Sequence, residues 1–277
     1  MSDILELARR KLTFALDVPD WDKAREIAGI VASHVGRIKL GPVILDNNGT
    51  PQVIKAMHQA GISNIFVDLK YHNTPDVVAA TVHNVTAMGV GMINVHCSGG
   101  IKMMHAAKQA AVRATLENYQ REIQNPLIIG VTILTTLDYD DLVALGIFPN
   151  ASFSNPDALV IHKKEKMEHL VVSLARAAQK AGLDGVAASV HEAPLIRNAC
   201  GPNFRIVTPG IRPAGADAGD QKRLDTPANA IKAGADELVV GSPIYKDPNP
   251  AEAAERIVRE IAEALTVRTE TQTETRH

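Results

Sequence analysis

Short apolar runs recur along the whole chain, separated by longer stretches with helical spacing. Each run is four to seven residues long and rich in Val and Ile. Several are apolar throughout rather than alternating, which is typical of parallel strands that are buried on both faces. The runs therefore predict eight strands, at residues 13–17, 37–41, 64–70, 91–96, 127–133, 185–189, 205–208 and 237–241.

Ala-rich segments with a helical period lie between the runs, and several of them end in a glycine. Gly61, Gly89, Gly182 and Gly234 stand where a helix would end just before the next strand, as left-handed C-terminal caps do. Alternating strands and helices predict an α/β fold, a single (β/α)8 TIM barrel, over residues 1–265. An open doubly wound sheet is the alternative, but no G-x-G-x-x-G follows the first run. The predicted helices span residues 21–35, 50–60, 76–88, 101–121, 166–181 and 226–233.

Two segments do not fit this repeat. Residues 148–165 are polar and contain Pro and Asn, which indicates a loop insertion with a short helical piece over the top of the barrel. Residues 266–277 alternate Thr with charged residues and have no apolar face, which predicts a disordered polar tail.

Composition narrows the class of protein. The 277 residues are 45% hydrophobic and 22% charged with a formal net charge of −2, and only 4% are aromatic, so a nucleic-acid-binding surface is not expected. The ten His are scattered without ligand spacing, so no metal site is predicted. Two cysteines fit a reducing compartment, and neither a secretory signal nor an apolar segment of membrane-spanning length is present. We therefore expect a cytoplasmic protein without membrane association.

Charged and polar residues follow the predicted strands at the end where a TIM barrel carries its active site. Asp68 and Lys70 are two residues apart at the end of one run, so strand alternation places both on the same face. From this segment alone, a surface ion pair explains them as well as a pocket in which Lys70 donates a proton and Asp68 fixes its charge. The other strand ends favour the pocket. In chain order they carry Asp17, Lys39, Asp68 with Lys70, His96, Thr135 with Thr136, Ser189, Pro209 and Gly210 with Arg212, and Gly241 with Ser242.

The last two strand ends have the composition of a phosphate site. A Gly-containing seventh loop and a Gly at the end of the eighth strand are where barrels bind phosphate through backbone N–H groups. Together with the two lysines and two aspartates, these loops predict a phosphorylated small-molecule substrate and proton or carbanion chemistry. No cofactor motif accompanies them.

Several runs of residues resemble the orotidine 5′-phosphate decarboxylase family, and the resemblance covers nearly the whole barrel. It is carried by FALD (residues 14–17), IKLG (38–41), Asp68-x-Lys70, NVHCSGG (94–100), VTILT (131–135) and, most specifically, VTPGIRP (207–213) continuing through AGDQ (218–221). The resemblance implies removal of CO₂ from C6 of orotidine 5′-monophosphate to give UMP in pyrimidine biosynthesis, without a cofactor. It also implies that Asp17 and Lys39 hold ribose hydroxyls, that Asp68 lies against the substrate carboxylate, and that Lys70 stabilises and protonates the C6 carbanion.

Four positions depart from the pattern of the family. Its motif is D-x-K-x-x-D, whose last acid enters the neighbouring subunit's site; this implies a homodimer with shared active sites, but the position is Asn73 in this chain. Ala214 stands where the family usually has a phosphate-binding Gln, and Ser242 stands where it has a phosphate-binding Arg. Val77 stands where a Thr commonly contributes a hydroxyl.

These departures leave three interpretations open. The first is a genuine decarboxylase that is weakened because remote phosphate binding normally helps to order the site. The second is a paralogue that binds or converts a related phosphorylated nucleotide or sugar. The third is a copy inactivated by drift or engineering. The presence of Lys39, Asp68 and Lys70 favours chemistry over binding alone.

Overall fold

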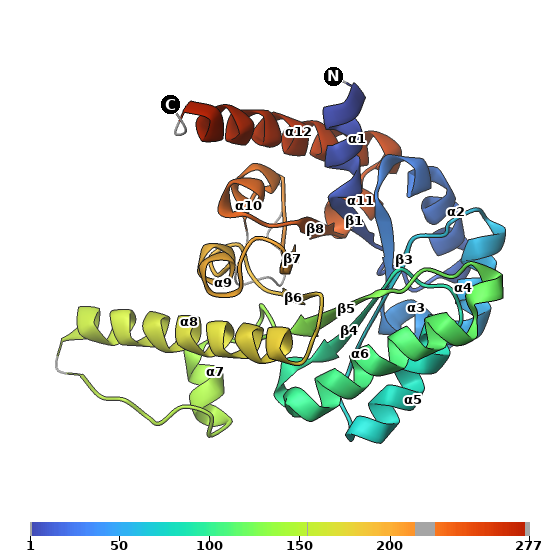
Figure 1. Ribbon diagram of the computed structural model, residues 1–277. Helices are drawn as coiled ribbons and strands as arrows, with labels where there is room; N and C mark the ends of the chain where they lie inside the picture. Colours follow the sequence, from blue (N-terminus) through green and yellow to red (C-terminus); the bar gives the residue numbers. More distant parts are fainter. Residues whose placement is uncertain (1, 154, 214–224, 275–277) are drawn as a thin grey trace.

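Eight parallel strands close into a barrel in which each strand pairs with its neighbours in sequence and β1 pairs with β8 (Figure 1). The computed structural model describes residues 2–153, 155–213 and 225–274, with side chains from residue 3 to residue 267 inside these ranges. The predicted TIM barrel is confirmed, and every predicted run overlaps one strand. The strands are β1 Leu12–Ala15, β2 Arg37–Leu40, β3 Ile65–Tyr71, β4 Met92–His96, β5 Leu127–Val131, β6 Gly185–Ala187, β7 Arg205–Thr208 and β8 Glu237–Val240.

Helices cover the outside of the barrel, and the first and last helices, α1 and α12, pack against each other (Figure 1). Glycines with positive φ end several of these helices, as expected; Gly182 and Gly234 have φ of 84° and 98°. Within the described residues, no helix is long and apolar enough to cross a membrane. The helices are α1 Ser2–Arg10, α2 Trp21–Val31, α3 Pro42–Asn48, α4 Thr50–Gln59, α5 Pro75–Thr86, α6 Gly100–Glu117, α7 Tyr139–Ala144, α8 Pro156–Lys180, α9 Ala193–Cys200, α10 Pro227–Ala233, α11 Ser242–Tyr245 and α12 Pro250–Glu274, with 3-10 turns η1 Ala32–His34, η2 Cys97–Gly99 and η3 Tyr119–Arg121.

The core has two layers because each strand is apolar on both faces. The outward faces of the strands pack against the helices in one large apolar cluster. The inward faces fill the barrel with a smaller cluster, made of Ala15, Phe66, Met92, Ile129, Val207 and Val239. Four of these inward residues also form the floor of a cavity above them, namely Ala15, Phe66, Val207 and Val239. The packed interior therefore supports a site at one end of the barrel.

The segment 148–165 differs from the predicted insertion in its second half. Residues from Pro156 onward are the first turns of α8, which extends past the edge of the barrel (Figure 1). Asn155 caps this helix by accepting a hydrogen bond from the N–H of Asp157, and Pro156 occupies the first turn. Beside α7, the chain forms a separate apolar cluster around Tyr139 and Met167.

The C-terminal segment also differs from the prediction. Helix α12 continues to Glu274, so most of residues 266–277 are helical rather than a disordered tail. A helix already formed by packing adds further residues at low cost, and the Thr266 hydroxyl donates to the Ala262 carbonyl one turn earlier.

Candidate active site

A cavity of about 500 Å³ opens at the carboxyl ends of the strands. Its size is that of a small-molecule site. The structure brings to its wall most of the predicted site residues that it describes; Asn73, His96 and Ser189 are exceptions. The predicted residues on the wall are Asp17, Lys39, Asp68, Lys70, Thr135, Thr136, Pro209, Gly210, Arg212, Gly241 and Ser242.

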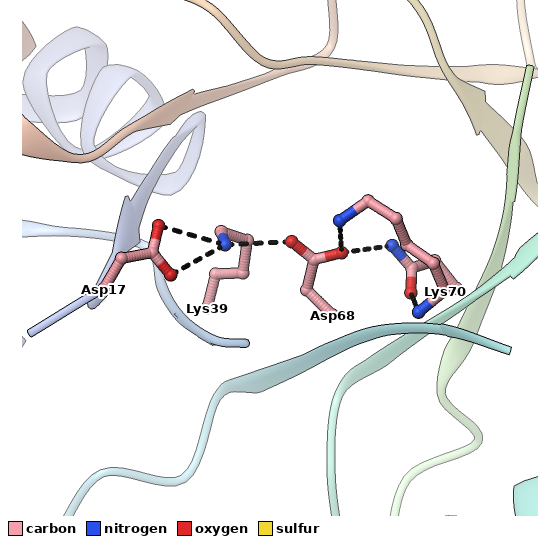
Figure 2. Close-up of polar contacts among 5 residues, drawn as sticks. Asp17, Lys39, Asp68 and Lys70 are labelled. Carbon is pink, nitrogen blue, oxygen red and sulfur yellow. Dashed lines mark hydrogen bonds and ion pairs between the residues drawn. The ribbon is translucent and has the colours of Figure 1, made fainter. Parts of the chain in front are cut away.

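Four charged side chains form a continuous line on one wall of this cavity (Figure 2). Lys39 Nζ lies 3.3 Å from Asp17 Oδ1 and 2.9 Å from Asp68 Oδ2. Lys70 Nζ donates to the other oxygen of Asp68, Oδ1, at 2.7 Å. Asp68 is therefore held between two ammonium groups, while the Lys70 side chain is 37% exposed and faces the cavity. This is an amine that can reach a ligand without leaving its carboxylate.

Burial and charge act against each other in this line. Burial alone would raise the pKa of Asp68, but the charges and hydrogen bonds of Lys39 and Lys70 hold that pKa below its ordinary value. Burial would lower the pKa of Lys39, but Asp68 and Asp17 hold it above its ordinary value. Both groups stay ionised near neutral pH, so the cavity presents fixed charges to any ligand.

The backbone of β3 is irregular where it carries Lys70. The pairing of β3 with β4 shifts register between Val67 and Tyr71, an irregularity of the kind that a β-bulge produces, and we refer to it as the bulge. Lys70 adopts φ of 46°, in the left-handed region that side chains rarely occupy. Its N–H donates to Asn94 Oδ1 at 2.8 Å, and Asn94 Nδ2 donates to Asp68 Oδ1 at 2.6 Å. The bulge, and not plain alternation, thus gives Lys70 its position beside Asp68.

The wall formed by the ends of β7 and β8 is suited to an anion. Gly210 has φ of 77°, a conformation that needs glycine, and it follows β7 directly after Pro209. Arg212 lines the cavity, and its Nε is buried without a hydrogen-bond partner among the described residues. Ser242 begins α11, and Lys246 follows that helix on the same wall. Backbone N–H groups, one guanidinium and one ammonium therefore share this side.

Three residues singled out from the sequence lie away from the cavity wall. Asn73 is exposed, and its side chain accepts a hydrogen bond from the N–H of Thr74 at 2.7 Å. His96 stacks at a tilt on His72, with ring centroids 5.5 Å apart. The hydroxyl of Ser189 donates to the buried carboxylate of Glu192 at 2.7 Å. Ala214 and Gln221 lie outside the described residues.

Sequence reasoning missed three polar side chains that line the cavity: Asn94, Tyr245 and Lys246. Asn94 lies inside the NVHCSGG segment, and its place within a buried apolar strand was the available signal, because a buried amide needs partners. Tyr245 and Lys246 lie one turn after Ser242, at the far end of a four-residue helix that the sequence gave little reason to expect. The part of the chain that the structure describes contains no group of three or more His, Cys, Asp or Glu side chains that could hold a metal ion.

A closed parallel barrel with a charged cavity at the carboxyl ends of its strands defines the TIM-barrel class of small-molecule sites. Residues 10–257 match the sequence model of the orotidine 5′-phosphate decarboxylase / HUMPS family. The chain belongs to this family.

Curated relatives match the chain over almost their full length. The orotidine 5′-phosphate decarboxylase of Geotalea daltonii is 42% identical over 254 residues, which cover 92% of this chain and 97% of that protein. The enzyme of the same name from Haemophilus influenzae strain Rd is 40% identical over 247 residues, covering 89% and 96%. Among solved structures, the orotidine 5′-phosphate decarboxylase of Lactobacillus acidophilus superposes with a TM-score of 0.74 at 29% identity, covering 90% of this chain and 98% of that one.

Proposed function

We propose that this protein decarboxylates orotidine 5′-monophosphate to UMP in pyrimidine biosynthesis, as a carboxy-lyase that needs no cofactor. The observation that carries the proposal is the line Asp17–Lys39–Asp68–Lys70 on the wall of a nucleotide-sized cavity. The names of the curated relatives support the substrate. Carbanion chemistry at a ring carbon requires fixed positive charge where negative charge develops, and Lys70 supplies it.

The proposed reaction gives each charge of the line a role, as the resemblance to the family implies. The C6–carboxylate bond breaks, its electron pair stays on C6, and CO₂ leaves. The ammonium of Lys70 stabilises this carbanion and then transfers one proton from Nζ to C6. Asp68, fixed against both lysines, lies next to the leaving carboxylate, where its negative charge disfavours the substrate relative to the transition state. Lys39 and Asp17 hold the ribose hydroxyls at the other end of the line.

The wall formed by the ends of β7 and β8 would hold the phosphate. Its donors are the backbone at Pro209, Gly210 and Gly241, the side chain of Arg212 and the hydroxyl of Ser242. A serine provides one hydroxyl where the family usually has the two parallel donors of an Arg. Lys246 lies on the same wall and adds a single positive charge. We therefore expect phosphate binding, and with it turnover, to be weaker than in family members with the Arg.

The protein would act as a homodimer. Residues 73–77, which follow β3 and include the first turn of α5, are exposed along their whole length, and the side chain of Val77 is 48% exposed. A continuous exposed segment beside the cavity is suited to insertion at a partner's site. With Asn73 in this segment, the partner would contribute an amide instead of a carboxylate, so the pattern of alternating charges would end at Lys70.

The side chains of Asn73 and Ser242 favour a second candidate function. Asn73 and Ser242 remove one negative and one positive charge from positions that the family uses, while the line Asp17–Lys39–Asp68–Lys70 is intact. A diverged paralogue that binds or converts a related phosphorylated nucleotide or sugar would carry such paired changes. It would bind UMP without turning over orotidine 5′-monophosphate.

The test is the loss of ultraviolet absorbance of orotidine 5′-monophosphate with the purified protein, and identification of UMP as the product. Lys70→Ala, purified in parallel from a host that lacks its own decarboxylase, is the matched control for contaminating enzyme. Activity in the unmodified protein and none in the variant supports the proposal, and activity that persists in a metal chelator supports its independence from metal. Binding of UMP by calorimetry with no turnover would instead establish the paralogue.

A further inference from the structure

Asn94 is a buried amide that both bonds the charged line and supports the irregular strand. It lies in the middle of β4 and is 2% exposed, yet its side chain borders the cavity. Its two side-chain polar atoms have different partners: Oδ1 accepts from the Lys70 N–H, and Nδ2 donates to Asp68 Oδ1. The Asn94 side chain thus links the backbone of Lys70 to the carboxylate of Asp68.

The bond to Asp68 matters most when Lys70 acts. Asp68 Oδ1 accepts from two donors, Lys70 Nζ at 2.7 Å and Asn94 Nδ2 at 2.6 Å. The Lys70 ammonium must turn towards the ligand and give up a proton, so its bond to Oδ1 is not constant through the reaction. The Asn94 amide cannot ionise and is fixed by its strand. It therefore keeps the carboxylate oriented, and its oxygen satisfied, while the ammonium is engaged elsewhere.

The bond to Lys70 acts on the backbone. The register shift between β3 and β4 occurs opposite Asn94, and Lys70 is held there with φ of 46°. A non-glycine residue keeps such a conformation only when the surroundings impose it. An acceptor at 2.8 Å for the Lys70 N–H provides that constraint. Without the acceptor, the amide would be unsatisfied next to a buried carboxylate, and the bulge would lose its fixed geometry.

We propose that Asn94 is a positioning residue for the proposed decarboxylation, which orients Asp68 and Lys70 together through its amide. The effect on kcat rests on the proposed function, whereas the effect on the orientation of Asp68 and Lys70 rests on the hydrogen bonds alone. Thr132 provides the contrast on the next strand end. It is 3% exposed, but its hydroxyl donates only to the Ala187 carbonyl, which also receives the Thr132 N–H.

Three variants of the full-length protein test the proposal: Asn94→Ala, Asn94→Asp and the control Thr132→Val. Asn94→Ala should lower kcat about 10- to 100-fold, the effect of losing one hydrogen bond to a charged group, with KM within about threefold. Asn94→Asp retains an acceptor for the Lys70 N–H but faces Asp68 with a second carboxylate. It should lower kcat at least as much as Asn94→Ala does, and move the acid limb of the kcat/KM profile to higher pH. Thr132→Val should leave kcat and the pH profile unchanged.

Two measurements do not depend on turnover. Carbon-13 NMR of the Asp68 carboxyl should give a higher pKa in both Asn94 variants than in the unmodified protein or Thr132→Val. Hydrogen exchange of the Lys70 amide should be faster in Asn94→Ala and remain slow in Asn94→Asp. If the unmodified protein shows no decarboxylation, the proposed function fails, while these two measurements still decide the role of Asn94. The proposal is overturned if Asn94→Ala keeps the Asp68 pKa and the Lys70 protection of the unmodified protein, or keeps its kcat.

Discussion

Restoring the two missing charges is the sharpest test of how far this site supports decarboxylation. Asn73→Asp together with Ser242→Arg should raise kcat/KM for orotidine 5′-monophosphate. Ser242 borders the cavity on the wall of Arg212 and Gly241, so an Arg there points at the same end of the ligand. A charge-assisted contact to phosphate contributes about 1.5–3 kcal/mol, which corresponds to roughly 10- to 150-fold in kcat/KM.

The aspartate should be tolerated by the fold. Asn73 is exposed and uses Oδ1 to accept the Thr74 N–H, and an aspartate of the same shape accepts the same bond. Its charge acts only if residues 73–77 reach the partner's site in a dimer. The two single variants separate the contributions, because the Arg acts within one subunit and the Asp acts across the interface.

The assay compares orotidine 5′-monophosphate with orotidine, the nucleoside that lacks phosphate. The gain from Ser242→Arg should appear with the nucleotide and be absent with the nucleoside. Ser242→Met is the matched control, because it adds length without charge. A gain of equal size on both substrates would show that the Arg does not meet phosphate. An unchanged or lower kcat/KM for the nucleotide in the double variant would refute the weakened decarboxylase and favour a site reshaped for another ligand.

Three further predictions follow from the charged line and its surroundings. Lys70→Ala and Lys70→Gly should both lose decarboxylation and keep the barrel by circular dichroism. Lys70→Gly should be more stable to urea than Lys70→Ala by up to about 1 kcal/mol, because the relief of left-handed strain exceeds the entropy cost of glycine. Equal stability of the two variants would contradict the strain at this position. In analytical ultracentrifugation the protein should sediment as a dimer at micromolar concentration, and Val77→Glu should shift it towards monomer; a monomeric unmodified protein would rule the dimer out. The free energy of unfolding should fall as pH drops below about 4, because Asp68 takes up a proton in the unfolded chain before it does so in the folded protein, where its pKa is lowered. It should also fall as pH rises above about 10.4, because the folded protein raises the pKa of Lys39 and the unfolded chain loses that proton first. Urea titrations across pH check both limbs, and a profile that the Asp68→Asn variant leaves unaltered would exclude this line as their source.

The pattern of apolar runs was sufficient to predict the barrel because buried parallel strands have a signature of their own. Each strand carries apolar residues on both faces, one packed in the barrel interior and one packed against the helices. The strands therefore stand out in the sequence as short apolar runs, even when their neighbours in the sheet are not known. The segment 148–165 was predicted as a loop with a short helical piece, and the long helix that starts at Pro156 was not expected, although Asn155 and Pro156 are a helix start signal. Its polar residues were given more weight than its cap. The prediction of a disordered tail after residue 265 was also wrong, because these residues extend a helix that is already packed and do not have to form a helix by themselves.

The candidate site shows where sequence reasoning ends. Alternation correctly expected Asp68 and Lys70 to face the same cavity, but the structure achieves this with a bulge and a left-handed Lys70. No local pattern predicts that conformation, because it is stabilised by a hydrogen bond from the Lys70 N–H to Asn94, which lies on another strand 24 residues later in the chain. Local preference and final structure disagree at the residue that would carry the chemistry. Such a disagreement is expected where a strained side chain must be held in one place for a reaction. The strain at Lys70 is therefore an argument for function that the charges alone do not provide, because a surface ion pair needs neither a bulge nor a left-handed backbone.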